Sequence, residues 1–140
     1  MPDAELSLPE MRAWGESLGA RLVPPAIVTL EGELGAGKTT LAQAICRGYG
    51  ALEPATSPTF ALVHEYHAPR SPVLHLDLYR LEGPHQLASI GWDDVLSSGA
   101  LVLVEWPERA GADAALQTPA TMALRVEHVP GAAQLRRVIW

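Results

Sequence analysis

The chain has 140 residues, of which 48% are hydrophobic, and its formal net charge is −6 at pH 7. This length predicts a single domain, with room for a sheet of roughly five to seven strands and a few helices. The acidic balance argues against charge-driven binding to nucleic acid or to an anionic membrane, because either would need a basic face. A protein partner or a small ligand is therefore expected.

Two further features of the composition bear on the compartment. Cys46 is the only cysteine, so there is no disulfide framework, and its place among apolar residues indicates a buried, reduced thiol. The sequence has neither a charged-then-apolar signal pattern nor a run of about 18 apolar residues. These features predict a cytoplasmic protein.

The first predicted element is an amphipathic helix. Residues Ser7 to Glu10 read S-x-x-E, which is the pattern of a capping box. Apolar residues then recur at spacings of three or four, at Met11, Trp14, Leu18 and Leu22. The prolines at 24 and 25 end the helix.

The next segment carries the strongest motif of the chain. An apolar strand from Ala26 leads into Gly32, Gly37, Lys38 and Thr39, which fill the spacing G-x-x-x-x-G-K-S/T, and a helical pattern follows. The backbone amides of such a loop converge on phosphate oxygens, and the N-terminus of the following helix strengthens the attraction. Lys38 would reach the β- and γ-phosphates, and the Thr39 hydroxyl would bind a bridging Mg²⁺. The segment predicts a site for a nucleoside triphosphate.

Lys38 is also the only lysine among ten basic residues. A compact ammonium fits a phosphate cradle, whereas the planar fork of arginine does not replace it there. The composition therefore supports the motif independently. We expect Gly48 and Gly50 to close the helix that follows the loop.

Residues 51–58 are rich in small residues and proline and predict an exposed loop, followed by a strand over 59–66. In phosphate-binding-loop proteins, a threonine or serine in this region often senses the γ-phosphate and the metal. Thr56, Ser57 and Thr59 are candidates. The equally good alternative is that Ser57 and Pro58 only begin the strand.

A second strand, over 73–78, alternates so that leucines occupy one face while His75 and Asp77 share the other. Asp77 lies near the end of this strand and Arg80 lies just beyond it, so both could reach a ligand at the carboxyl edge of a sheet. Alternatively, Asp77 and Arg80 form a surface ion pair.

Residues 83–98 predict one or two short helices with a break at Gly91, and 100–105 form a continuous apolar run that ends in Glu105. An acidic residue that closes a buried strand is typical of a group linked to Mg²⁺ or to the attacking water. Asp77 and Glu105 both qualify. We favour Glu105 because its strand has the buried character expected beside the loop strand, although a carboxylate at a strand end can also be merely solvated.

Trp106 and Pro107 end this strand, and 108–119 read as a linker rich in small residues. Two further strands, over 121–129 and 135–140, flank Pro130 and Gly131 as a terminal antiparallel hairpin that could extend the sheet. The histidines are interpreted as non-ligands, because His64 and His67 would face opposite sides of a strand. The predicted fold is α/β, a P-loop NTPase fold whose central, mainly parallel sheet is flanked by helices and carries this hairpin.

The choice of nucleotide follows from what the chain lacks. Guanine selection through an N-K-x-D stretch is impossible, because the chain has no asparagine and no lysine besides Lys38. ATP is therefore the expected nucleotide. A small-molecule kinase remains an alternative, but it would normally add an arginine-rich lid, which the segment after Glu105 does not resemble. A nucleotide-gated binding module with negligible catalysis is a third possibility.

Four motifs in order resemble the TsaE family (also called YjeE), which acts in the biosynthesis of threonylcarbamoyladenosine in tRNA. They are GELGAGKTT at 32–40, SPTF at 57–60, HLDLYRL at 75–81 and LVEWPER at 103–109. The resemblance implies a single P-loop ATPase domain over 1–140. It also implies a nucleotide site formed by Glu33, Leu34, Gly35, Ala36, Gly37, Lys38, Thr39 and Thr40.

The resemblance further implies Mg²⁺ near Thr39 and Glu105, and functional roles for Asp77 and Trp106. The family's ATPase supports turnover of a partner complex of TsaD and TsaB type proteins, which transfers threonylcarbamoyl to adenosine 37 of tRNAs that read codons beginning with adenine. Contact with tRNA would then be made mainly through the partners. Low intrinsic activity is expected, since no arginine is placed by sequence as a finger, although Arg80 could serve.

Overall fold

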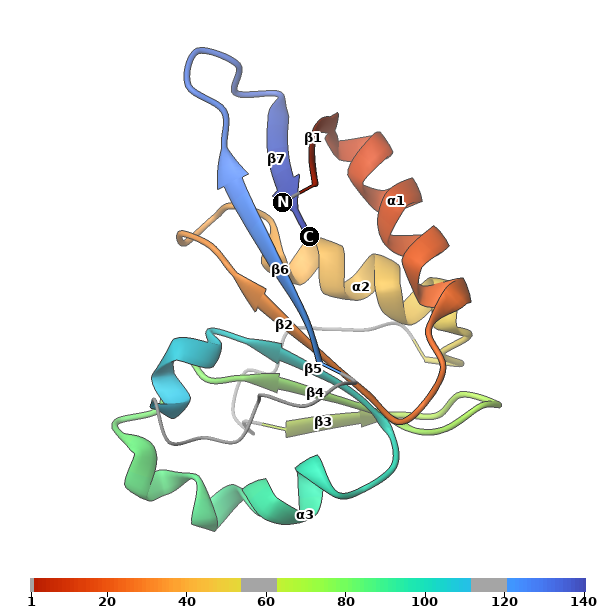
Figure 1. The fold of residues 1–140 in the computed structure, drawn as a ribbon, viewed down its shortest axis with the longest axis vertical. Coiled ribbons are helices and arrows are strands. Elements are labelled where there is room, and N and C mark those ends of the chain that lie inside the picture. The colour runs from red at the N-terminus through yellow and green to blue at the C-terminus, as the bar shows by residue number, and fades with distance from the viewer. Residues whose placement is uncertain (1, 54–62, 112–120) are drawn as a thin grey trace.

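The computed structural model describes residues 2–53, 63–111 and 121–140. These residues form a sheet of seven strands with helices on both faces (Figure 1). The strands are β1 (Asp3–Ser7), β2 (Ala26–Glu31), β3 (Val63–Tyr66), β4 (Val73–Asp77), β5 (Leu101–Glu105), β6 (Thr121–His128) and β7 (Leu135–Ile139). The α-helices are α1 (Leu8–Arg21), α2 (Lys38–Tyr49) and α3 (Trp92–Leu96), and three 3₁₀ turns, η1 (Pro84–Gln86), η2 (Ala88–Ile90) and η3 (Pro107–Ala110), complete the described elements.

The sheet is parallel in its centre and antiparallel toward both edges. Its order is β1-β7-β6-β2-β5-β4-β3, and β2 pairs in parallel with both β5 and β6, while β5 also pairs in parallel with β4. The pairs β6–β7, β7–β1 and β3–β4 are antiparallel. The predicted α/β fold with a parallel centre and a C-terminal hairpin is confirmed, and the hairpin extends the sheet as expected.

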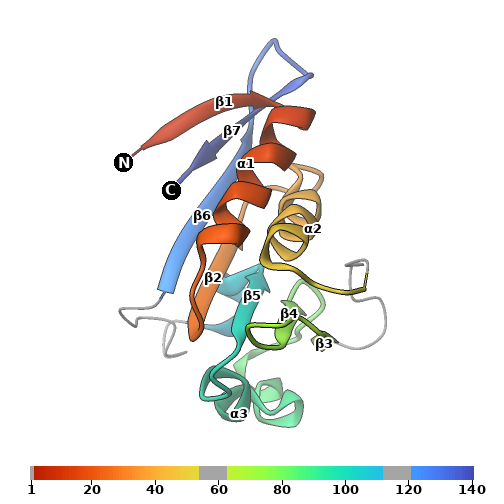
Figure 2. The ribbon, with the colours of Figure 1, turned by 90° about the vertical axis from the view of Figure 1, so that its right-hand side faces the viewer.

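One apolar cluster fills the space between the sheet and the helices on each of its two faces. Helices α1 and α2 lie together on one face of the sheet (Figure 2), where Met11, Leu41 and Ile45 pack against Val28 and Leu103. On the other face, the segment of η2 and α3 covers the leucines of β4. It also covers Val102 and Val104 of β5. The alternation predicted for 73–78 therefore places His75 and Asp77 on the α2 side.

Helix α1 begins with the predicted capping box. The Ser7 hydroxyl accepts a hydrogen bond from the Glu10 amide, and the Glu10 carboxylate accepts one from the Ser7 amide. The helix ends at Arg21, ahead of the two prolines. This part of the sequence interpretation is confirmed.

The close crossing of α1 and α2 corrects one prediction. Gly50 caps α2 in the left-handed conformation as expected, but Gly48 lies inside the helix. A Cβ added at Gly48 would overlap the backbone of Glu16, and one added at Gly19 would overlap the backbone of Ile45. These glycines let the two helix backbones touch, which is a tertiary requirement and not a helix-stop signal.

Replacement of Gly48 by alanine tests this packing. The intrinsic helix propensity of alanine would favour the variant by about 1 kcal/mol, but the added methyl must push α1 away. We expect a net loss of about 1–3 kcal/mol in the free energy of unfolding, measured by urea denaturation. Ser17→Ala, at an exposed position of α1, is the control and should change stability by less than about 0.5 kcal/mol. A Gly48→Ala protein at least as stable as the native one would contradict the packing argument.

Strand β1 was not predicted, because its sequence, DAELS, is short and mostly polar. Its stability comes from pairing with β7, including an ion pair of 2.7 Å between Glu5 and Arg137. The linker predicted for 108–119 is also wrong at its start, where η3 forms over Pro107–Ala110. The rest of that linker from 112 on, and the 54–62 part of the predicted loop and strand with Thr56, Ser57 and Thr59, lie outside the described residues.

Cys46 lies on α2 and is buried in the apolar cluster that α1 and α2 form with the sheet, which confirms the expectation of a buried thiol. Burial raises the pKa of this thiol to about 12, so it carries no thiolate at neutral pH. Within the described part of the chain, none of the helices is long and apolar enough to cross a membrane.

Candidate functional site

The glycine loop, defined here as Gly32 to Gly37, connects the buried strand β2 to helix α2. Gly32, Gly35 and Gly37 have φ angles of 150°, 77° and 110°, which side chains rarely allow. A Cβ at Gly32 would also overlap the carbonyl oxygen of Val126 on β6. The motif glycines are therefore needed both for the path of the loop and for its close packing on the sheet.

The loop leaves the N-terminus of α2 available to a ligand. Helix α2 has 12 residues, and its N-cap residue, Gly37, makes no side-chain capping hydrogen bond. Its first turn contains Lys38, Thr39 and Thr40 and no acidic residue. Because the first amides of a helix lack internal partners and lie at the positive end of its dipole, this terminus is suited to an anion.

Lys38 is folded back over the loop and is only 5% exposed. Its Nζ donates to the carbonyl oxygens of Gly32 at 2.6 Å and Glu33 at 2.8 Å. Burial lowers the pKa of the Lys38 ammonium, while the carboxylates of Glu105, Glu108 and Asp77 act in the opposite direction. A phosphate anion beside Nζ would supply a stronger partner than the loop carbonyls do.

Glu105 is brought to Thr39 by the parallel pairing of the central strands. It ends β5, opposite Leu30 of β2 and Asp77 of β4, and it is 2% exposed. The Thr39 hydroxyl donates to its Oε1 at 2.9 Å, and its Oε2 lies 2.6 Å from Nε2 of His75. The predicted placement of the Glu105 strand beside the loop strand is confirmed.

Asp77 lies one strand further from the loop. Its Oδ1 accepts a hydrogen bond from the backbone amide of Tyr79 at 3.0 Å. Burial raises the pKa of Asp77, the Tyr79 amide opposes this rise, and the nearby Glu105 carboxylate adds to it. Of the two carboxylates proposed from sequence, Glu105 contacts Thr39, and Asp77 lines the same pocket.

That pocket has a volume of about 370 Å³. It collects most of the residues proposed from sequence: Leu34, Gly35, Gly37, Lys38, Thr39, Thr40, Asp77, Glu105 and Trp106, together with Tyr79. Arg80 is exposed and is absent from this lining, and Thr59 lies outside the described residues. Tyr79 was not predicted as a site residue, although its position between Asp77 and Arg80 in the HLDLYRL motif could have indicated that it lies near the site.

Aromatic side chains cover the lysine. Trp106 adopts a left-handed conformation, with φ of 58°, directly after β5. Its ring lies under the Lys38 ammonium at 4.1 Å from the centroid, and its centroid is 4.9 Å from that of Tyr79. The geometry is that of a cation–π contact. Trp106 thus closes one side of the pocket, at the strand end that the sequence indicated.

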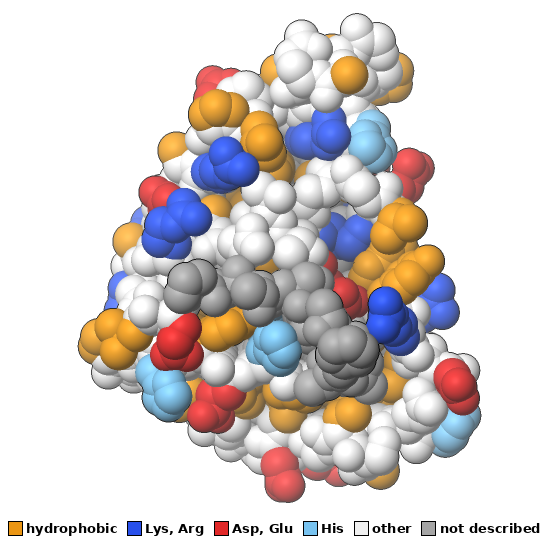
Figure 3. All heavy atoms as spheres, turned by 180° about the vertical axis from the view of Figure 1, so that it is seen from behind, with side chains coloured by type: hydrophobic (Ala, Val, Ile, Leu, Met, Phe, Trp, Pro, Cys, Tyr) orange, Lys and Arg blue, Asp and Glu red, His pale blue; other side chains and the backbone are white. Residues whose placement is uncertain are grey.

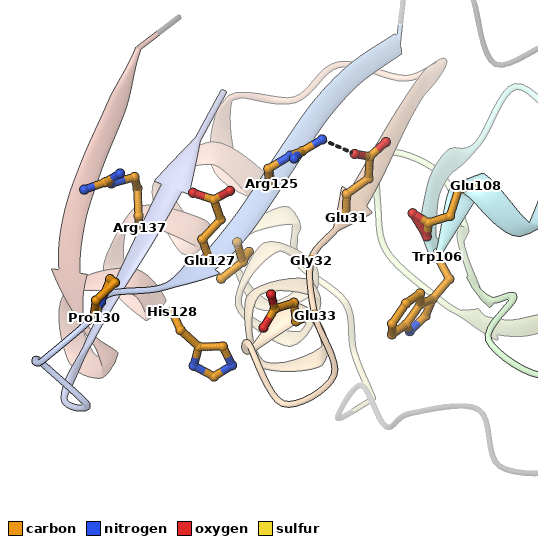
Figure 4. A pocket seen from close by; sticks show the side chains of 11 residues that line it. Glu31, Gly32, Glu33, Trp106, Glu108, Arg125, Glu127, His128, Pro130 and Arg137 are labelled. Atoms are coloured by element: carbon orange, nitrogen blue, oxygen red, sulfur yellow. Dashed lines mark hydrogen bonds and ion pairs between the residues drawn. The ribbon is translucent and has the colours of Figure 1, made fainter.

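A larger cavity of about 680 Å³ lies on the other side of Trp106 (Figure 4). Four carboxylates line it, from Glu31, Glu33, Glu108 and Glu127. Its arginines are already engaged: Arg125 pairs with Glu31 at 2.9 Å, and Arg137 pairs with Glu5. The negative charge makes this cavity unsuitable for a triphosphate despite its size.

The face of the molecule opposite to the view of Figure 1 carries no continuous basic patch among its described residues. On the face drawn in Figure 3, lysine and arginine side chains are scattered and are interspersed with aspartate and glutamate. This distribution agrees with the acidic net charge.

Taken together, the fold and the pocket define an α/β protein that carries a lysine-bearing glycine loop at the carboxyl edge of a parallel sheet. The chain belongs to the TsaE family: the family model described as "Threonylcarbamoyl adenosine biosynthesis protein TsaE" matches residues 6–138.

Individual relatives agree with this assignment. A "tRNA threonylcarbamoyladenosine biosynthesis protein TsaE" from Treponema pallidum is 35% identical over 113 residues, which cover 81% of this chain and 82% of that protein. A protein of the same name from Nostoc sp. is 44% identical over 99 residues, or 68% of this chain; the alignment spans 60% of the Nostoc protein. The crystal structure of YdiB from Bacillus subtilis has the same fold, with a TM-score of 0.74 and 23% identity over 98% of this chain and 83% of that one.

Proposed function

We propose that the chain is a single-domain P-loop ATPase that supports threonylcarbamoyladenosine formation at position 37 of tRNAs reading codons that begin with adenine. The observation that carries the nucleotide site is the convergence of three features on one pocket. They are the N-terminus of α2 with glycine as its N-cap residue, the buried Lys38 ammonium, and Thr39 in contact with Glu105. The family membership carries the assignment to the tRNA-modification pathway.

In the proposed site, the amides of Glu33 to Thr40 surround the β- and γ-phosphates, and Lys38 exchanges its two loop carbonyls for phosphate oxygens. This exchange conserves hydrogen bonds while adding an attraction between opposite charges. The small residues on either side of Lys38 leave room for the phosphates. ATP is the proposed nucleotide, because the chain lacks the asparagine and the second lysine with which guanine is read.

The residues of the site also fit Mg²⁺. The Thr39 hydroxyl and the Glu105 carboxylate are hard oxygen donors 2.9 Å apart, and Mg²⁺ in nucleotide sites needs only one or two protein ligands beside phosphates and water. Bound Mg²⁺ would neutralise charge on the β- and γ-phosphates. Thr39 and Glu105 would hold it, and Asp77, half-buried one strand away, would help to orient the attacking water.

We further propose that the protein works in the cytoplasm with TsaD and TsaB type proteins, and that hydrolysis supports turnover of their complex. The acidic charge balance supports contact with tRNA through these partners rather than directly. Low hydrolysis by the isolated chain is expected, because no arginine lines the pocket among the described residues.

The experiment is a reconstitution of threonylcarbamoyl transfer to tRNA with TsaD and TsaB type proteins, with and without this chain. We expect ATP hydrolysis to rise when the partner complex is added, and multiple rounds of tRNA modification to require the chain. Absence of ATP binding and hydrolysis in both conditions would overturn the proposal. Phosphate transfer to a metabolite that outpaces transfer to water would instead identify a small-molecule kinase.

A further inference from the structure

A buried chain of hydrogen bonds continues inward from the Thr39–Glu105 pair. His75, on β4, has no exposed surface, and its Nε2 lies 2.6 Å from Oε2 of Glu105. On the other side of the ring, Nδ1 lies 3.3 Å from the hydroxyl of Tyr66, on the neighbouring strand β3. Four side chains from α2, β5, β4 and β3 are thus connected in sequence.

The two oxygens of Glu105 have different partners, and this difference fixes the direction of the carboxylate. Oε1 accepts from Thr39 at the pocket, while Oε2 accepts from Nε2–H of His75 in the interior. A ring that donates from Nε2 can accept the Tyr66 hydroxyl at Nδ1, so both ring nitrogens are satisfied. A carboxylate with only 2% exposure needs such partners, because water cannot replace them there.

The pairing of the strands makes this arrangement rigid. His75 and Glu105 lie on adjacent parallel strands on the same face, with His75 opposite Leu103 and Asp77 opposite Glu105. The pairing fixes the two backbones relative to each other, and the imidazole, which is fully buried and also bonded to Tyr66, has little room to follow the carboxylate if the carboxylate turns. A glutamate at a strand end would otherwise sample several rotamers.

We propose that His75 is a positioning residue that holds Oε2 of Glu105 in the interior, so that Oε1 stays directed at Thr39 and at the Mg²⁺ position. This inference rests on the proposed Mg²⁺–ATP site. Outer-shell partners of this kind orient metal ligands, and their loss typically reduces metal affinity about 10- to 100-fold. His75 does not touch the nucleotide in this scheme and acts only through Glu105.

The test compares three substitutions of His75 by calorimetric titration with the non-hydrolysable analogue AMP-PNP, in Mg²⁺ and in EDTA. The measured quantity is the gain in affinity that Mg²⁺ confers. His75→Leu removes the donor, and His75→Asn keeps a polar group that is too short to reach Glu105. His75→Gln places an amide donor near the position of Nε2. Thermal unfolding without nucleotide reports separately on the fold.

We expect the gain from Mg²⁺ to fall about tenfold or more in His75→Leu and His75→Asn, and to be largely restored in His75→Gln. Affinity in EDTA should change less than about threefold in all variants. If His75→Leu does not fold, the Asn and Gln pair decides the question. A wild-type gain from Mg²⁺ in His75→Asn, or an equal loss in EDTA, would overturn the role of His75 while leaving the proposed ATPase intact. A wild-type protein that binds no AMP-PNP would overturn both.

Discussion

Replacement of Lys38 by alanine should abolish measurable ATP binding while the fold stays intact. The Lys38 ammonium is the only cation among the described residues that line the pocket at the glycine loop. Its hydrogen bonds are to the carbonyls of Gly32 and Glu33 in that loop. Charge-assisted hydrogen bonds contribute about 1.5–3 kcal/mol each. Loss of two such bonds predicts about 3–6 kcal/mol, or roughly 100- to 10,000-fold weaker binding. Calorimetric titration with ATP and Mg²⁺ measures the effect.

The control for charge is Arg47→Ala, which removes one positive charge from the other end of the same helix. Arg47 is exposed and pairs with Glu16 on α1. Its removal should leave the ATP affinity within about twofold and should cost at most about 1 kcal/mol of stability. An unchanged ATP affinity in Lys38→Ala, with a native circular dichroism spectrum in both variants, would rule out the glycine loop as the phosphate site.

The second large effect is expected for Glu105→Gln. The amide is nearly isosteric, so its oxygen can still accept from Thr39 or from His75, and the buried core should be preserved. The negative charge that the proposed site offers to Mg²⁺ is lost, however. We expect ATP binding to persist and partner-stimulated hydrolysis to fall about 100-fold or more, the range seen for positioned catalytic groups.

Asp77→Asn distinguishes the two carboxylates that the sequence left as rivals. Asp77 bonds the Tyr79 amide and not Thr39, so its replacement should lower hydrolysis without removing the gain in nucleotide affinity from Mg²⁺. Steady-state hydrolysis and AMP-PNP titration should be measured for both variants. If Asp77→Asn loses the Mg²⁺ dependence and Glu105→Gln keeps it, the metal assignment is reversed.

The sequence was sufficient for the parts of the fold that depend on local pattern. The capping box at Ser7, the glycine loop before α2 and the apolar run ending in Glu105 each follow from nearest neighbours in the chain. The parallel order β6-β2-β5-β4 was expected only in outline. Even so, it was enough to bring Glu105 to the edge where Thr39 lies, since parallel strands end together.

The remaining features depend on contacts between distant segments. Gly48 looks like a helix stop in sequence, and only the approach of α1 shows that its lack of a side chain is a packing requirement. His75 was placed on the correct face, but its contact with Glu105 requires the register of β4 against β5. Strand β1 exists because β7 is available to pair with it. Local pattern carries no information on these partners.

The most direct measurement of the central claim is a crystal structure with AMP-PNP and Mg²⁺ bound. We expect the β- and γ-phosphates within the glycine loop, Lys38 Nζ moved from the carbonyls of Gly32 and Glu33 to phosphate oxygens, and the metal beside Thr39 and Glu105. A nucleotide bound away from the loop, or a metal held by Asp77 while Glu105 remains bonded to Thr39, would contradict the account.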